Sequence, residues 1–231
     1  MYRASLILLL ILTVFAIGSV VIALPLPLTG QVINLKELIP LTSSRKEFKI
    51  TDGKDRGKKV PLTLQPNPTD ERRWTLTFGD YGRIFLMRGP DGELVMERMD
   101  LFNSKSRIVY EPALKILLPG DANSAGSLQR ETDYKMYRAD TGRLKRAGRV
   151  THLVKKVSHS QFNTPAGPLD GYYIEIEHKM DMEYFSELLL TVGLGCRLDE
   201  GLVYGAAHYK LSKLGGIFTE TRTAAAALAQ R

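Results

Sequence analysis

The side chains that most often carry out chemistry are few in this chain and lie far apart in the sequence. Cys196 is the only cysteine, and no nucleophile signature surrounds it, so we predict a buried thiol. The histidines lack the HxH, HxxxH and HExxH spacings typical of metal sites. They are His152, His159, His178 and His208. The sequence therefore predicts surface or packing histidines, no metal, no cofactor and no catalytic residue.

A glycine-containing segment, Gly193-Leu194-Gly195, is similar in part to a dinucleotide-binding loop. Leu198 occupies the position of the third glycine, and no clear helix follows to bind a phosphate at its N-terminus. We interpret the segment as a turn or bulge near a strand end. A non-catalytic protein is favoured, and an uncharacterised hydrolase remains the second alternative.

Basic residues are concentrated in two blocks of a chain with a formal net charge of +7. Arg45 to Lys59 carries a net charge of +4, and Arg143 to Lys156 carries +6. These blocks could contact anionic head groups or another polyanion, or they could be solvated strand edges and turns. The candidate contact residues are Lys145, Arg146, Arg149, Lys155 and Lys156.

Methionine and aromatic residues recur across several predicted strands. Because methionine adapts to irregular apolar ligands, a concave sheet lined by such residues could hold a lipid or an acylated molecule. Ordinary core packing is the alternative. The candidate lining residues are Met87, Met96, Met136, Tyr134 and Tyr172.

The elements that would position these residues are predicted to be antiparallel strands. Trp74, Leu76 and Phe78 alternate with threonines, as in a half-buried strand, and 89–92 predicts a hairpin turn between two further strands. Similar runs follow, separated by Gly, Pro, Asp or Asn. They are Thr132–Arg138, Arg149–Val157, Tyr172–His178 and Leu202–Leu211. The fold class is therefore mainly β, with few short helices.

Three segments carry helical features. Val32–Ile39 is a candidate short helix, and Glu183–Thr191 suits either a strand or a helix. The alanine-rich end has high helix propensity but few large apolar residues, so we predict a frayed helix or a disordered tail over 219–231. The main β domain is expected over 46–218.

The stretch from Ser5 to Leu24 contains twenty residues without a charge, enough for a helix of about 30 Å, the thickness of a hydrocarbon core. We predict a signal anchor over 1–24 and a linker over 25–45. The charge distribution predicts a single-pass inner-membrane protein with a cytoplasmic N-terminus and a periplasmic domain. A periplasmic protein released by signal cleavage is the alternative. Nucleic acid is excluded as a partner by this location, and the oligomeric state stays open.

Short motifs in the last two thirds of the chain resemble exported bacterial LolA-like domains. They are Tyr110-Glu111-Pro112, Leu117-Leu118-Pro119-Gly120, Thr164–Leu169 followed by the strand Tyr172–His178, and Val192–Gly195 followed by a strand through Tyr209–Leu214. The resemblance covers about 74–214 and implies a curved antiparallel sheet, or half barrel, in the periplasm. The best-understood members of that superfamily shelter the acyl chains of lipoproteins. No functional residue transfers, because the matched positions are mainly turn glycines and prolines.

Two functions follow as hypotheses. The first is a membrane-tethered periplasmic β domain that binds an apolar or amphipathic ligand of the cell envelope in its concave face. The second is a scaffold domain with a packed core, which recruits an envelope protein through the basic blocks or a free sheet edge.

Overall fold

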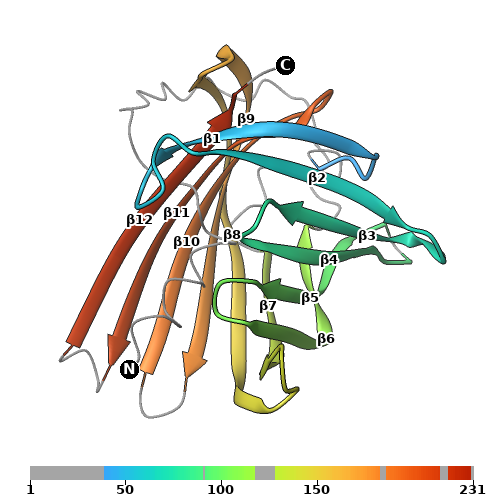
Figure 1. Ribbon diagram of the computed structural model, residues 1–231, viewed down its shortest axis with the longest axis vertical. Coiled ribbons are helices and arrows are strands. Elements are labelled where there is room, and N and C mark those ends of the chain that lie inside the picture. Colours follow the sequence, from blue (N-terminus) through green and yellow to red (C-terminus); the bar gives the residue numbers. More distant parts are fainter. Residues whose placement is uncertain (1–38, 91, 118–127, 183–185, 214–217, 230–231) are drawn as a thin grey trace.

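The structure, a computed structural model, describes residues 39–90, 92–117, 128–182, 186–213 and 218–229. These residues form twelve antiparallel strands that close into one barrel, in which neighbours along the chain are neighbours in the sheet (Figure 1). The strands are β1 (Ser44–Asp52), β2 (Lys59–Asn67), β3 (Asp70–Phe78), β4 (Gly82–Arg88), β5 (Leu94–Leu101), β6 (Ser106–Leu117), β7 (Leu128–Arg138), β8 (Leu144–Thr164), β9 (Gly167–Met182), β10 (Ser186–Arg197), β11 (Gly201–Lys213) and β12 (Phe218–Leu228).

The mainly β prediction is confirmed, but the predicted half barrel and its few helices are corrected. The sheet is closed because β12 pairs with β11 on one side and with β1 on the other. No helix occurs among the described residues. The predicted anchor over 1–24 and nearly all of the predicted helix over Val32–Ile39 lie outside the described residues. The ambiguous Glu183–Thr191 segment is strand β10 from Ser186 onward.

The alanine-rich end is the closing strand of the barrel rather than the predicted tail. In β12, Ala226 lies opposite Ile50 of β1 and Gly205 of β11, and Leu228 lies opposite Phe48. Residues 224–228 are all buried. The helix propensity of alanine is overridden here because β12 is hydrogen-bonded to a neighbouring strand along both of its edges and its small side chains are buried. The barrel thus extends from Ser44 to Leu228, beyond the predicted 46–218 domain.

Replacing Ala226 by leucine is expected to lower the free energy of unfolding by about 2 kcal/mol, because Ala226 is fully buried and the added side chain overpacks the interior. Chemical denaturation monitored by circular dichroism measures this effect. Thr221→Leu is the control, since Thr221 is exposed on the same strand and should tolerate the change. Equal midpoints for the two variants would contradict the tight packing of β12.

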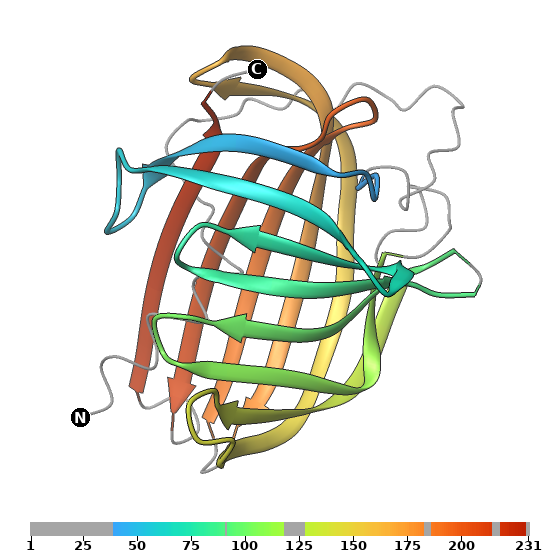
Figure 2. The ribbon, with the colours of Figure 1, turned by 45° about the vertical axis from the view of Figure 1, so that its right-hand side comes forward.

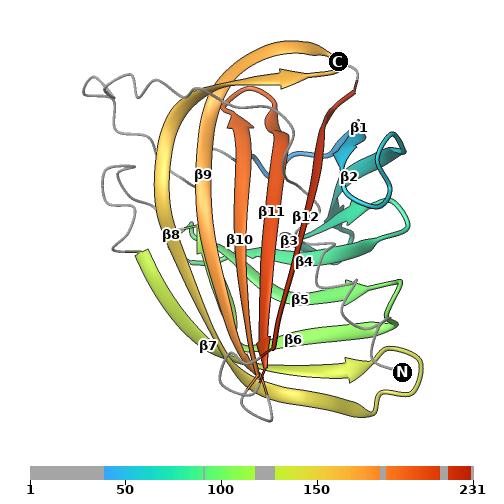
Figure 3. The same ribbon diagram turned by 90° about the vertical axis from the view of Figure 1, so that its left-hand side faces the viewer.

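The barrel has two walls that differ in strand length and direction. The long strands β8 to β12 run along one wall, and strands β1 to β6, of which β1 to β5 are shorter, cross them at a steep angle on the other (Figures 2 and 3). Strand β8, with 21 residues, pairs with β7 through its first half and with β9 through most of its length. The inward side chains of the two walls enclose the core.

The tip of the β8–β9 hairpin curls over one end of the barrel (Figure 3). Its Phe162 ring stacks on Tyr204 of β11, with ring centroids 5.5 Å apart. The amide of Ala166 donates a hydrogen bond of 3.2 Å to the carbonyl of Leu228 at the end of β12. These contacts tie the hairpin to the two strands beneath it.

The segment that precedes β1 packs against the turn between β10 and β11. A Cβ atom added to Gly201, which has a φ of +68°, would lie 3.0 Å from Cδ of Pro40. Ile39 and Leu41 pack against the hydrophobic core. This arrangement brings the residues just before β1 next to the interior of the barrel.

Candidate functional site

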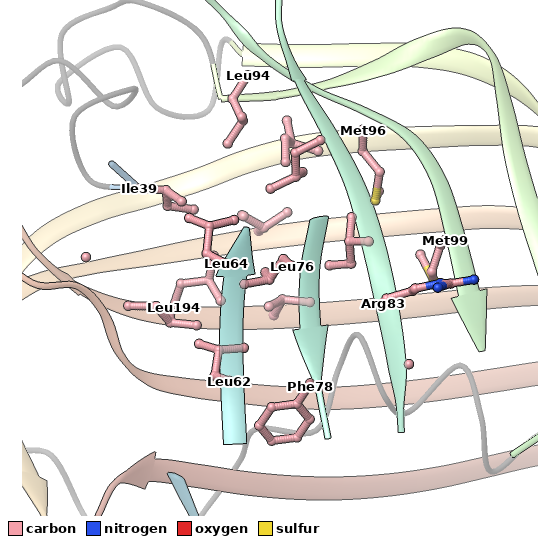
Figure 4. Close-up of a pocket in the computed structure, with 18 of the residues that line it drawn as sticks. Ile39, Leu62, Leu64, Leu76, Phe78, Arg83, Leu94, Met96, Met99 and Leu194 are labelled. Carbon is pink, nitrogen blue, oxygen red and sulfur yellow. The ribbon is translucent and has the colours of Figure 1, made fainter. Parts of the chain in front are cut away.

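An apolar cavity of about 420 Å³ lies between the two walls of the barrel. Figure 4 shows side chains from several strands pointing into it, with Ile39 near Leu64 and Leu194, and Arg83 near Met99. Aliphatic side chains of both walls form most of its lining. Representative members are Leu64, Leu76, Ile84, Met96, Val192 and Leu194. Its volume falls within the usual range of small-molecule sites.

Strand alternation explains how the lining is assembled. Leu62 and Leu64 of β2 project inward at a spacing of two, and Val192 and Leu194 of β10 do the same from the opposite wall. Val192 and Leu194 are only partly buried although they face the interior. Their remaining exposed surface therefore borders the cavity, and the barrel interior is incompletely filled by its own side chains.

A small cluster of charged side chains borders the part of the cavity that lies next to the segment before β1. The ammonium group of Lys46 donates hydrogen bonds to the carbonyl oxygens of Glu200 and Leu202, the second at 3.2 Å. Asp199, Glu200 and Lys46 all contribute to the cavity lining. Burial lowers the pKa of Lys46, and the nearby Glu200 carboxylate opposes that shift. A ligand with a polar end would find charged and hydrogen-bonding groups here.

Two histidines form a second polar feature inside the apolar lining. His152 of β8 and His178 of β9 are register partners, and both are buried cavity-lining residues. Their Nδ1 atoms are 3.2 Å apart, and Nε2 of His152 is 3.1 Å from the carbonyl oxygen of Ile116. Burial lowers the pKa of His152 to about 4 and that of His178 to about 3. Both rings are therefore neutral at pH 7.

The five predicted ligand-lining residues are distributed over different environments. Met96 lines the cavity, while the other four are not among its lining residues. Tyr134 is fully buried, and its hydroxyl donates a 2.9 Å hydrogen bond to the carbonyl of Asp181. Tyr172 packs edge-to-face against His159. Met87 follows the inward-facing Leu86 on β4, and Met136 is partly buried against the core.

The five predicted polyanion contacts all lie on β8, and most already have partners within the chain. The ammonium group of Lys145 donates a 2.7 Å hydrogen bond to the hydroxyl of Ser106. Lys155 forms a 3.0 Å ion pair with Glu177 of β9. Arg149 lies 3.7 Å from Asp133 of β7. These partners reduce the net positive charge that the strand presents to a polyanion.

Lys156 and Arg146 complete the predicted basic set. Lys156 is exposed next to the exposed Lys155 because the pairing of β8 with β9 shifts register between Val154 and Lys156. Arg146 is partly buried and has an interaction within the chain. The structure thus brings the five residues onto one strand without gathering them into a single site.

Sequence reasoning missed the histidine pair and most of the cavity lining. His152 and His178 are 26 residues apart in the sequence, so no local spacing connects them. The pairing register of β8 with β9 is the signal that would have found them. Cys196 is buried as predicted, and burial raises the pKa of its thiol to about 12.

No protein-family model matches this chain, and no curated protein matches it. Two solved structures do match, and both are described as lipoproteins. One, from Parabacteroides distasonis, is 11% identical with a TM-score of 0.39, and the match covers 87% of this chain and 99% of that one. The other, YmcC from Escherichia coli, is 8% identical with a TM-score of 0.36, and the match covers 86% and 89% of the two chains. These values do not place the chain in a family with either.

The predicted localisation, a single-pass inner-membrane protein, is corrected. Both matched solved structures are described as lipoproteins, a class of protein held to membranes by an attached lipid rather than by a spanning helix. In the part of the chain that the structure describes, there is no helix of sufficient length and apolarity to cross a membrane. The apolar stretch from Ser5 to Leu24 lies outside that part.

Proposed function

We propose that this protein is a non-catalytic binding protein that holds an apolar or amphipathic ligand inside its barrel. A lipid or an acylated molecule of the cell envelope is the ligand class that fits best. The observation that carries the proposal is the cavity of about 420 Å³, lined mainly by aliphatic side chains of both walls. Burial of a hydrocarbon chain there would be favourable by about 0.8 kcal/mol for each methylene group removed from water.

The distribution of polar groups supports an amphipathic ligand. The charged side chains of Lys46 and Glu200 line one part of the cavity, next to the segment before β1. Aliphatic side chains line the rest, among them Leu76, Ile84 and Val192. Ligand sites of this kind bind mainly through apolar surface, with a few polar groups that fix orientation. An alkyl chain that carries a polar group matches this pattern.

Filling the cavity should strongly reduce ligand binding. Val192→Trp places a large side chain into the interior, and Leu189→Trp on the same strand is the matched control because alternation turns Leu189 outward. The full chain and both variants are purified in the same way, and the lipids that they retain are extracted and quantified by mass spectrometry. We expect the control to retain as much lipid as the unmodified protein and Val192→Trp to retain at least about fivefold less.

The unmodified protein and both variants carry the same apolar N-terminal stretch. Lipid bound to that stretch is therefore equal in all three, and a difference in retained lipid reports binding in the cavity. Circular dichroism and thermal melting establish that the variants are folded. If folded Val192→Trp retains the same lipids in the same amount as Leu189→Trp, the cavity is not the binding site and the proposed function is wrong.

A further inference from the structure

The hydrogen bonds of His152 fix the proton positions of the histidine pair. The carbonyl of Ile116 can only accept a hydrogen bond, so Nε2 of His152 must carry the proton at 3.1 Å. In a neutral ring the Nδ1 of His152 is then an acceptor. Nδ1 of His178, 3.2 Å away, must donate to it. The remaining ring nitrogen of His178, Nε2, therefore has no proton and is an acceptor.

This Nε2 atom belongs to a side chain that lines the cavity. It has no hydrogen-bond partner among the described residues. His178 is buried, with 8% of its surface exposed. The apolar lining thus contains a buried acceptor that none of the described residues satisfies.

We propose that the ligand is a neutral lipid with a free hydroxyl group, and that this hydroxyl donates a hydrogen bond to Nε2 of His178. The inference rests on the proposed function and names its ligand class. An ionised carboxylate or a phosphate diester has no proton to donate and would be repelled by the lone pair of Nε2. An alcohol, such as a monoacylglycerol or a diacylglycerol, satisfies the acceptor that the described residues leave open.

Competition between an alcohol and its ether tests this inference. Decanol and decyl methyl ether have similar alkyl chains, but only the alcohol can donate a hydrogen bond. Native mass spectrometry of the full chain, incubated with both at equal concentration, measures the ratio of the two complexes. We expect about threefold to tenfold more alcohol complex, as one additional hydrogen bond in an apolar site predicts. In His178→Phe the ratio should fall to about one.

Tyr110→Phe is the control variant. The hydroxyl of Tyr110 also belongs to a cavity-lining residue and has no partner among the described residues, but it is sealed from open space. The preference for the alcohol should therefore survive Tyr110→Phe. Loss of the preference in Tyr110→Phe and its retention in His178→Phe would overturn the assignment to His178.

A second measurement covers the case in which His178→Phe does not fold. In the unmodified protein labelled with ¹⁵N-histidine, the Nε2 resonance of His178 should shift when decanol is added and should stay in place with the ether. Binding of both compounds with no preference and no resonance shift would overturn the inference while leaving the proposed function intact. Binding of neither compound would contradict the proposed function itself.

Discussion

Lowering the pH from 7 to 5 is expected to reduce the free energy of unfolding by about 4 kcal/mol, with about 2 kcal/mol from each of His152 and His178. Burial lowers their pKa values in the folded protein to about 4 and about 3, against about 6.5 for an unfolded histidine. Between these values the unfolded chain binds protons that the folded chain does not. This contribution to stability is therefore complete above pH 6.5 and falls as the pH decreases, toward about 4 for His152 and about 3 for His178.

Urea denaturation of the full chain at a series of pH values between 4 and 8 measures this dependence. The double variant His152→Leu/His178→Leu is the control, because it keeps His159 and His208 but removes the buried pair. Its stability should be nearly constant between pH 7 and pH 5. A pH dependence equal to that of the unmodified protein would show that the two rings are not buried as neutral groups.

Replacing Asp100 by alanine is expected to lower the free energy of unfolding by about 3 kcal/mol. The Asp100 side chain is 5% exposed and binds three arginines. Its carboxylate lies 3.0 Å from Arg83, 3.2 Å from Arg98 and 3.1 Å from Arg107. Arg83 and Arg107 are also its register partners on β4 and β6. Without the carboxylate, three guanidinium groups would remain close together with no anion between them.

Asp140→Ala is the matched control for this prediction. Asp140 also pairs with an arginine, Arg138, at 2.9 Å, but its side chain is 36% exposed in a turn. Exposed ion pairs of this kind contribute about 0 to 1 kcal/mol. Chemical denaturation of both variants at pH 7 and low salt gives the comparison. Similar losses for the two substitutions would show that the Asp100 cluster behaves as an ordinary surface ion pair.

The strand pattern of the middle of the chain could be predicted from local sequence. The alternation around Trp74, Leu76 and Phe78 predicts β3, and the glycines and proline at 89–92 predict the turn between β4 and β5, both of which the structure contains. Local alternation and turn residues are sufficient in these cases because they depend on neighbours along the chain.

The closure of the barrel could not be predicted in this way. It depends on β12 pairing with β1, and these strands are more than 160 residues apart in the sequence, as the register of Ile50 with Ala226 shows. An alanine run indicates helix when only local propensity is considered. Its burial between two paired strands is a tertiary effect, and the prediction of a tail was therefore wrong.

An apolar lining was expected from the sequence, but most of the residues that form it were not predicted. Of the five methionines and tyrosines predicted to line the cavity, only Met96 does so, although Met99, Met180 and Tyr110 also belong to the lining. Leucine, isoleucine and valine side chains, such as Leu76, Ile84 and Val192, form most of the apolar lining. These residues are indistinguishable from ordinary core residues until the two walls are placed at a distance that leaves space between them.

The most direct test of the account is a crystal structure of the protein with a long-chain alcohol that carries bromine at the end of its alkyl chain. Anomalous scattering locates the bromine independently of any assumed binding mode. We expect a single strong bromine peak inside the barrel, within the cavity, with the hydroxyl next to His178. A cavity that stays free of the alcohol at saturating concentration, with bromine only on the outer surface, would contradict the claim that the barrel interior is the ligand-binding site.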